Sequence, residues 1–149
     1  MSSLSYHEKP LWDMISIMVK VKSVDHIKIL VRDYKTSKTF YAKLMRFLGL
    51  RVFMRGRNYI GWKNAATRFF IAKVSPKYKK IRHREGMVGY HHVSFAVRNR
   101  KDVDAVGTFL KKINADIIDP PMEHYGGPMY AAFFRDPDGM KIEVMYWGK

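Results

Sequence analysis

Apolar residues recur along the chain in an order that occurs twice. Residues 25–33 and 91–99 each contain a short apolar run in which hydrophobic and polar positions alternate. A stretch follows in which apolar residues are three and four positions apart, the spacing of one face of an α-helix. Several short apolar runs bounded by turn residues come next. A repeat of this length predicts two copies of one supersecondary unit.

The order of elements within each copy is β-α-β-β-β. Asp33 and Asn99 are suited to cap the two helices, because their side chains accept hydrogen bonds from free backbone N–H groups. The helices are predicted from two apolar sets: Phe40, Tyr41, Leu44, Phe47 and Leu48, and then Val103, Val106, Phe109, Leu110 and Ile113. Strands are predicted at residues 50–55, 57–62, 68–74, 115–119, 129–134 and 140–147. The sequence therefore predicts an α+β fold of two tandem βαβββ modules.

The modules are expected to form one domain over residues 22–149. Module one spans 24–74, a linker rich in Lys and Arg spans 75–89, and module two spans 90–147. One module alone has too little apolar surface to be stable. Residues 1–21 form an N-terminal extension, whose apolar stretch is too short for a membrane span and lacks a secretory cleavage pattern.

Three stretches resemble a known family. They are residues 24–27 (VDHI), residues 91–95 (HHVSF) and, most specifically, residues 133–144 (FFRDPDGMKIEV). The chain resembles the vicinal oxygen chelate (VOC) superfamily, which includes glyoxalase I, bleomycin-resistance proteins and type I extradiol dioxygenases. The resemblance runs from about residue 24 to residue 147. It implies that the paired modules curve into a cup-like mixed sheet with the helices outside and any metal at the base of the cup.

Three residues are candidate metal ligands. Side chains alternate between the faces of a strand, so His26, His92 and Glu143 are expected on the face away from the helices. A carboxylate among apolar residues is costly to bury unless it is paired or bound to a metal. The resemblance implies that these three residues bind a divalent ion of Fe, Mn, Ni or Zn. Two imidazoles and one carboxylate are suitable ligands for these ions. The alternative is that they form a hydrogen-bonded polar network without metal.

One position departs from the family pattern. In glyoxalase I and methylmalonyl-CoA epimerase a second carboxylate ligand closes the first module. Alignment of residues 68–72 with residues 141–145 places Phe70 at the position of that second carboxylate, equivalent to Glu143. This departure argues against those two activities.

Substrate contacts are predicted from charge and position. Lys28, Arg68 and Lys141 are expected on the inner face, where a positive wall favours an anionic substrate. Alternatively, these side chains extend to the rim. Residues 120–127, with His124 and Tyr125, are expected to form a loop that closes over the cup. Tyr130 is a further candidate substrate contact.

Composition narrows the partners and the compartment. The chain has 149 residues, no cysteine, and 28 Lys and Arg against 13 Asp and Glu, a formal charge of +15. Absence of cysteine excludes disulfides and thiolate sites and suits a cytoplasmic protein. The charge raises the question of nucleic-acid binding. The basic run at residues 77–84 has no accompanying nucleic-acid-binding motif, so we do not expect specific binding.

These observations favour a metal-dependent, glyoxalase- or dioxygenase-like enzyme acting on a small, oxygen-rich, anionic substrate that chelates the metal through two oxygens. The alternative is a metal-free, small-molecule-binding protein similar to bleomycin-resistance proteins. In this superfamily the cup is often completed by dimerisation, so the resemblance also implies a symmetric homodimer.

Overall fold

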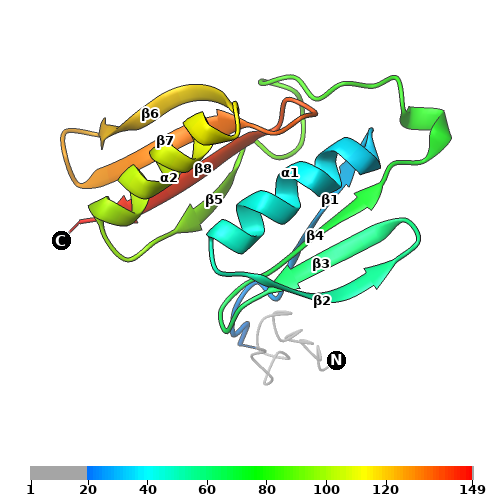
Figure 1. Cartoon of the computed structure of the whole chain (residues 1–149), viewed down its shortest axis with the longest axis horizontal. Coiled ribbons are helices and arrows are strands. Elements are labelled where there is room, and N and C mark those ends of the chain that lie inside the picture. Colours follow the sequence, from blue (N-terminus) through cyan, green and yellow to red (C-terminus); the bar gives the residue numbers. More distant parts are fainter. Residues whose placement is uncertain (1–19, 149) are drawn as a thin grey trace, which may run out of the picture.

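The computed structural model describes residues 20–148 and confirms two βαβββ modules (Figure 1). The extension predicted at residues 1–21 lies almost wholly outside the described residues. Module one contains β1 (Ile27–Val31), α1 (Tyr34–Phe47), β2 (Arg51–Gly56), β3 (Tyr59–Lys63) and β4 (Arg68–Lys73). A linker with a short 3-10 helix (Pro76–Tyr78) follows. Module two contains β5 (Val93–Ala96), α2 (Arg100–Lys112), β6 (Asp116–His124), β7 (Met129–Arg135) and β8 (Lys141–Trp147).

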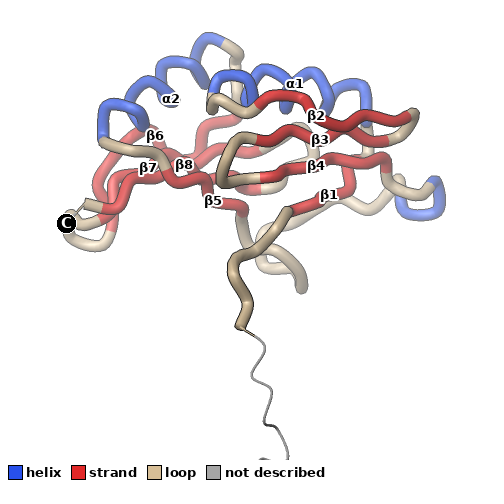
Figure 2. The backbone as a smooth tube through the Cα atoms, turned by 90° about the horizontal axis from the view of Figure 1, so that it is seen from below, coloured by secondary structure: helices blue, strands red, loops and turns tan. Residues whose placement is uncertain are grey.

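Each module forms its own four-stranded mixed sheet. The strand orders are β1-β4-β3-β2 and β5-β8-β7-β6, with β1 parallel to β4 and β5 parallel to β8. Both helices lie on the same side of the two sheets (Figure 2). The sheets are not joined to each other or closed, and their opposite faces carry the candidate site. Within residues 20–148, no helix is long and apolar enough to cross a membrane.

The helices begin at the predicted caps. Asp33 Oδ1 accepts hydrogen bonds from the backbone N–H groups of Lys35 and Thr36, at 3.0 and 3.1 Å. Asn99 Oδ1 accepts one from the N–H of Asp102 at 3.0 Å. These bonds satisfy donors that have no partner within the helix. Both capping predictions are confirmed.

The apolar faces of the helices cover one core shared by both modules. Its buried members come from α1, α2 and strands of each sheet, and include Tyr41, Leu44, Trp62, Phe69, Phe95, Val106, Leu110, Phe134 and Ile142. At the outer surface of this core, the rings of Phe47 and Phe109 stack, with their centroids 4.2 Å apart. The two modules therefore share one hydrophobic core.

Strand β6 is longer than the sequence predicted. The predicted strand ended at residue 119, and residues 120–127 were expected to form a loop, whereas β6 continues to His124. Its register with β7 shifts twice, between Ile117 and Asp119 and between Asp119 and Met122. Such irregularities accommodate Pro120 and Pro121 in an outer strand, where a missing N–H is tolerated. The prediction of a long closing loop was therefore wrong.

A buried hydrogen bond joins the two modules. The Tyr41 hydroxyl in α1 donates to Asp136 Oδ2 in the β7–β8 turn at 2.8 Å. Asp136 Oδ1 accepts from the N–H groups of Asp138 and Met140, at 2.9 and 2.8 Å. The N–H of Arg32, at the end of β1, donates to Asp138 Oδ2 at 2.8 Å. The closing turn of module two is thus fixed to the start of module one.

We expect Tyr41→Phe to lower the free energy of unfolding by about 1–3 kcal/mol, because it leaves a buried carboxylate oxygen without its donor. Urea unfolding at neutral pH measures the loss. Thr39→Ala is the control, since its exposed hydroxyl only donates to the backbone carbonyl of Lys35. Equal stability of Tyr41→Phe and the wild type would contradict the role given to this bond.

Asp136 also predicts a pH dependence. Burial raises the pKa of Asp136 above its ordinary 3.8, although bonds from Tyr41 and the two backbone N–H groups oppose the rise. A carboxyl with a raised pKa binds its proton more tightly in the folded state. Its contribution to stability is therefore full below the unfolded pKa and is lost as the pH rises through the folded pKa.

Asp136→Asn removes this titration and keeps the shape of the side chain. We expect the difference in unfolding free energy, wild type minus Asp136→Asn, to fall as the pH rises from about 3 to about 6. Urea unfolding across this pH range measures the difference. A difference that stayed constant or rose with pH would contradict the prediction.

Candidate metal and ligand site

The faces of the strands agree with the predicted alternation. In β1, Ile29 and Val31 are buried toward the helices, while Lys28 and Leu30 are exposed on the opposite face. In β5, Val93 and Phe95 are buried, and Ser94 and Ala96 face away. We call this second surface, opposite the helices in both modules, the inner face. The candidate metal ligands belong to it.

The strand register confirms that Phe70 and Glu143 occupy equivalent positions. Lys28 of β1 pairs with Phe70 of β4, and Ser94 of β5 pairs with Glu143 of β8. Lys28 and Ser94 follow His26 and His92 by two residues each. The two modules thus present an imidazole beside a phenyl ring in one case and an imidazole beside a carboxylate in the other.

His92 and Glu143 are in direct contact on the inner face of module two. His92 Nε2 lies 3.1 Å from Glu143 Oε2. Glu143 is only 4% exposed, although its neighbours in β8 are Ile142 and Val144. Two atoms that each ligate one metal at about 2.1 Å, with tetrahedral or octahedral angles, lie about 3.0–3.4 Å apart. The donor atoms and their separation fit a shared divalent cation as well as a direct hydrogen bond between the two side chains.

His91 contacts His92, an arrangement that was not predicted from the sequence. Strict alternation would place His91 on the face opposite His92, but both histidines precede β5, so the rule does not apply to them. His91 Nδ1 lies 2.7 Å from His92 Nδ1, and His91 Nε2 lies 3.9 Å from Glu85 of the linker. A hydrogen bond to the second ring nitrogen orients an imidazole ligand. The doubled histidine was the signal available in the sequence.

His26 is held apart from this pair within one chain. Its Nδ1 lies 2.9 Å from Asp25 Oδ2, and its ring meets the edge of Phe70 with centroids 5.4 Å apart. It lines a hollow with residues 94–97 of module two. Among the described residues, no three His, Cys, Asp or Glu side chains lie close enough to hold a metal. The expected three-ligand set is therefore not assembled inside a single chain.

The predicted positive wall is partly neutralised. Arg68 pairs with Asp25, and Lys141 Nζ lies 3.4 Å from Glu85 and 4.8 Å from the centroid of the Phe133 ring. The hydrogen bond from Lys141 holds the pKa of Glu85 below its ordinary 4.5. Lys28 Nζ lies 5.6 Å from the centroid of the Tyr59 ring, and no Asp or Glu among residues 20–148 forms an ion pair with Lys28. Lys28 therefore remains available to attract an anion.

The three candidates near β6 and β7 separate in space. His124 lies beside Phe133, with ring centroids 5.1 Å apart, and its Nε2 is buried without a hydrogen-bond partner. Tyr125 is 81% exposed in the short turn after β6. Tyr130 instead faces α2, because its hydroxyl donates to Asp104 Oδ1 at 2.8 Å. Tyr130 is thus on the wrong side of the sheet for the proposed substrate contact.

Comparison with known proteins agrees with this geometry. The sequence profile of the Glyoxalase/Bleomycin resistance protein/Dioxygenase superfamily matches residues 23–144. The chain belongs to this superfamily. This superfamily member is 30% identical over 132 residues to the uncharacterised protein YaeR of Escherichia coli (strain K12), covering 85% of the chain and 98% of YaeR. It is 23% identical over 122 residues to the uncharacterised YqjT of Bacillus subtilis (strain 168), covering 80% of the chain and 95% of YqjT.

Solved structures support the fold of this superfamily member. A crystal structure from Bacillus halodurans matches with a TM-score of 0.76 and 23% identity, covering 84% of this chain and 96% of the other. A glyoxylase/bleomycin resistance protein/dioxygenase domain from Frankia sp. EAN1pec matches with a TM-score of 0.71 and 22% identity, covering 86% and 99%. These likenesses confirm the two-module fold.

We expect Gly61→Ala to disturb the inner face of module one. A Cβ at this position would lie 2.5 Å from Cε1 of Phe70 and 3.1 Å from Cε1 of Phe53. Relieving this overlap displaces the Phe70 ring and costs about 1–3 kcal/mol of unfolding free energy. Thermal or urea unfolding measures the cost.

The double variant Gly61→Ala/Phe70→Leu is the control for that cost, because a smaller side chain at position 70 removes the overlap. We expect the double variant to lose less unfolding free energy than the two single variants lose in total, because the effects of substitutions at contacting residues are not additive. Strict additivity would show that Phe70 does not rest on Gly61.

Proposed function

We propose that this superfamily member is a metal-dependent enzyme acting on a small, oxygen-rich, anionic substrate. The observation that carries the proposal is the contact between His92 and Glu143. A nearly buried carboxylate lies on a strand face that points away from the core, against an imidazole at a separation suited to shared ligation. A carboxylate in such a place needs a cationic partner.

His92 Nε2 and Glu143 Oε2 would hold the metal, with His26 as the third ligand. A divalent ion bound there would polarise two neighbouring substrate oxygens and stabilise negative charge that develops on them. His91 orients His92 through the contact between their Nδ1 atoms. Lys28 attracts the anionic part of the substrate.

We propose that a second copy of the chain supplies the missing ligand. His26 lies apart from His92 and Glu143 within one chain, so a symmetric dimer would bring His26 of one subunit to His92 and Glu143 of the other. Two equivalent sites per dimer follow from two-fold symmetry. Members of this superfamily commonly complete the cup in this way.

A second candidate function rests on the aromatic surface of module one. The Phe70 ring meets both His26 and Phe53 edge to face, each with centroids 5.4 Å apart. Such a surface suits a planar aromatic ligand. In this alternative the protein binds a small molecule without metal, and His92 and Glu143 form a polar pair in the pocket.

Metal content distinguishes these functions. We expect protein purified without a metal-affinity tag, and reconstituted with iron, manganese, nickel or zinc, to bind about one ion per chain. His26→Ala, His92→Ala and Glu143→Ala are expected to lose this ion, because each removes a ligand. His91→Ala should retain it with affinity lowered about tenfold, as for loss of a group that orients a ligand. Elemental analysis and metal titration measure both effects.

His83→Ala is the matched control, since His83 belongs to the linker. Equal metal retention in Glu143→Ala and His83→Ala would rule out the metal site. Mixing unfolded His26→Ala with Glu143→Ala and refolding them together tests the shared site. Random pairing makes about half of the dimers mixed, each with one complete site, so about a quarter of the wild-type metal should return. No recovery would contradict ligation across subunits.

A further inference from the structure

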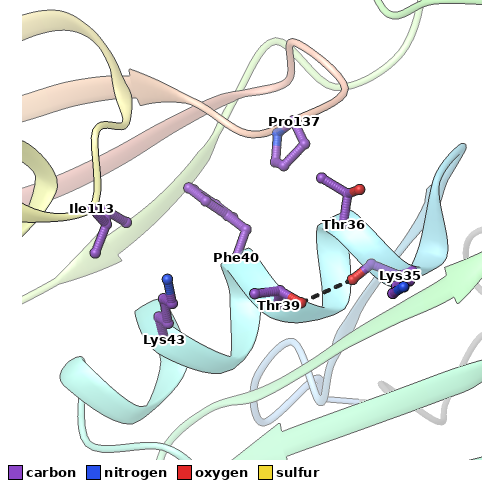
Figure 3. A pocket seen from close by; sticks show the side chains of 7 residues that line it. All are labelled: Lys35, Thr36, Thr39, Phe40, Lys43, Ile113 and Pro137. Atoms are coloured by element: carbon purple, nitrogen blue, oxygen red, sulfur yellow. Dashed lines mark hydrogen bonds between the residues drawn. The ribbon is translucent and has the colours of Figure 1, made fainter.

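A groove runs between α1 and α2 on the surface opposite the candidate metal site. Two adjoining hollows share Lys43 and Ile113, and the larger has a volume of about 1070 Å³. Figure 3 shows one end of the groove, with Phe40 extending from α1 between Pro137 and Ile113. The other end contains the stacked rings of Phe47 and Phe109. The floor is therefore apolar over most of its length.

The charged residues that line this groove all carry positive charge. They are Lys35, Lys43, Arg46 and Lys112, and no Asp or Glu of the described chain lines either hollow. Helix α1 contains no acidic residue at all. The two acidic residues of α2 are engaged elsewhere, Asp102 with Arg98 and Asp104 with Tyr130. Nothing on the groove walls neutralises the four cations.

The exposed apolar floor also lacks a partner within the described chain. Phe47 is 42% exposed although one face of its ring is covered by Phe109. The stretch of α1 from Lys35 to Arg46 is about 16 Å long at 1.5 Å per residue. An amphipathic helix of about three turns has this length and presents an apolar stripe with polar flanks.

We propose that this groove binds an acidic amphipathic helix of a partner protein. The apolar stripe of the partner would cover Phe40, Phe47 and Ile113, and acidic residues on its flanks would pair with the cationic rim. This is the helix-in-groove mode of recognition, in which an apolar helix face enters a hydrophobic groove. Binding of an acidic helix would also account for part of the formal +15 charge, which the metal site does not explain.

Charge and shape argue against other occupants. A second copy of the chain would bring the same basic rim against this one, and like charges across an interface are unfavourable. Nucleic acid would satisfy the cations through its phosphates but leave the apolar floor uncovered. An acidic helix satisfies both parts of the groove.

The probe is a fluorescein-labelled, 14-residue peptide of Leu and Glu, with the leucines on one helical face. Fluorescence anisotropy with the full chain, at about 0.1 M salt to limit screening, measures its binding. A peptide with Lys in place of Glu should not bind. Lys43→Glu/Arg46→Glu should weaken binding of the acidic peptide about tenfold or more, because two rim charges are reversed. Phe47→Gln should weaken binding of the acidic peptide to a similar extent, because it removes an aromatic side chain from the apolar floor.

The matched control is Lys38→Glu/Lys111→Glu. It makes the same change in net charge, on exposed residues of the same two helices that do not line the groove. We expect it to bind nearly as the wild type does, and circular dichroism confirms that both variants fold. Equal weakening in the two double variants would overturn the proposal in favour of diffuse attraction.

Two further outcomes would also overturn the proposal. One is absence of binding by the acidic peptide. The other is that a labelled 12-nucleotide oligothymidine binds instead, and that Lys43→Glu/Arg46→Glu weakens this binding whereas Phe47→Gln does not. That result would assign the groove to nucleic acid.

Discussion

The arrangement of the two modules depends on the hydrogen bond between Tyr41 and Asp136. Both groups are buried, and 95 positions separate them in sequence. Burial raises the pKa of the Tyr41 hydroxyl well above its ordinary 10.0, so this group stays a donor. The turn that contains Asp136 leads directly into β8, the strand that carries Glu143. Together with the bond from Arg32 to Asp138 and the shared apolar core, this polar contact fixes how the β8 end of the inner face lies relative to module one.

The two halves of the inner face are alike in backbone and different in chemistry. Equivalent register positions hold Phe70 in module one and Glu143 in module two. Module one consequently offers an aromatic surface around His26, and module two offers a buried carboxylate with two adjoining histidines. Duplication of the module provides the scaffold, while the chemistry of each half depends on which side chain occupies each equivalent position.

Local patterns in the sequence predicted the features that depend on neighbouring residues. The helix caps at Asp33 and Asn99, the order of the strands and the equivalence of Phe70 and Glu143 were all predicted in this way. Features that depend on distant residues were not. The length of β6 is determined by its pairing with β7, and the separation of His26 from His92 by how the modules pack. Tyr130 was also placed wrongly: it shares a face of β7 with Phe134, and because Phe133 and Phe134 are both apolar, alternation alone did not indicate which face meets the helices.

The prolines of β6 have a consequence for self-association. β6 forms the outer border of the second sheet, and Pro120 and Pro121 remove two N–H donors from it. A foreign strand therefore cannot extend this sheet by a regular ladder. Strand β2, the outer border of the first sheet, exposes Val52 and Met54 but has Arg51, Arg55 and Arg57 around them. Edge-to-edge polymerisation through β6 or β2 is therefore disfavoured, so two copies of the chain can form a closed pair only through other surfaces, such as the inner face or the borders at β1 and β5.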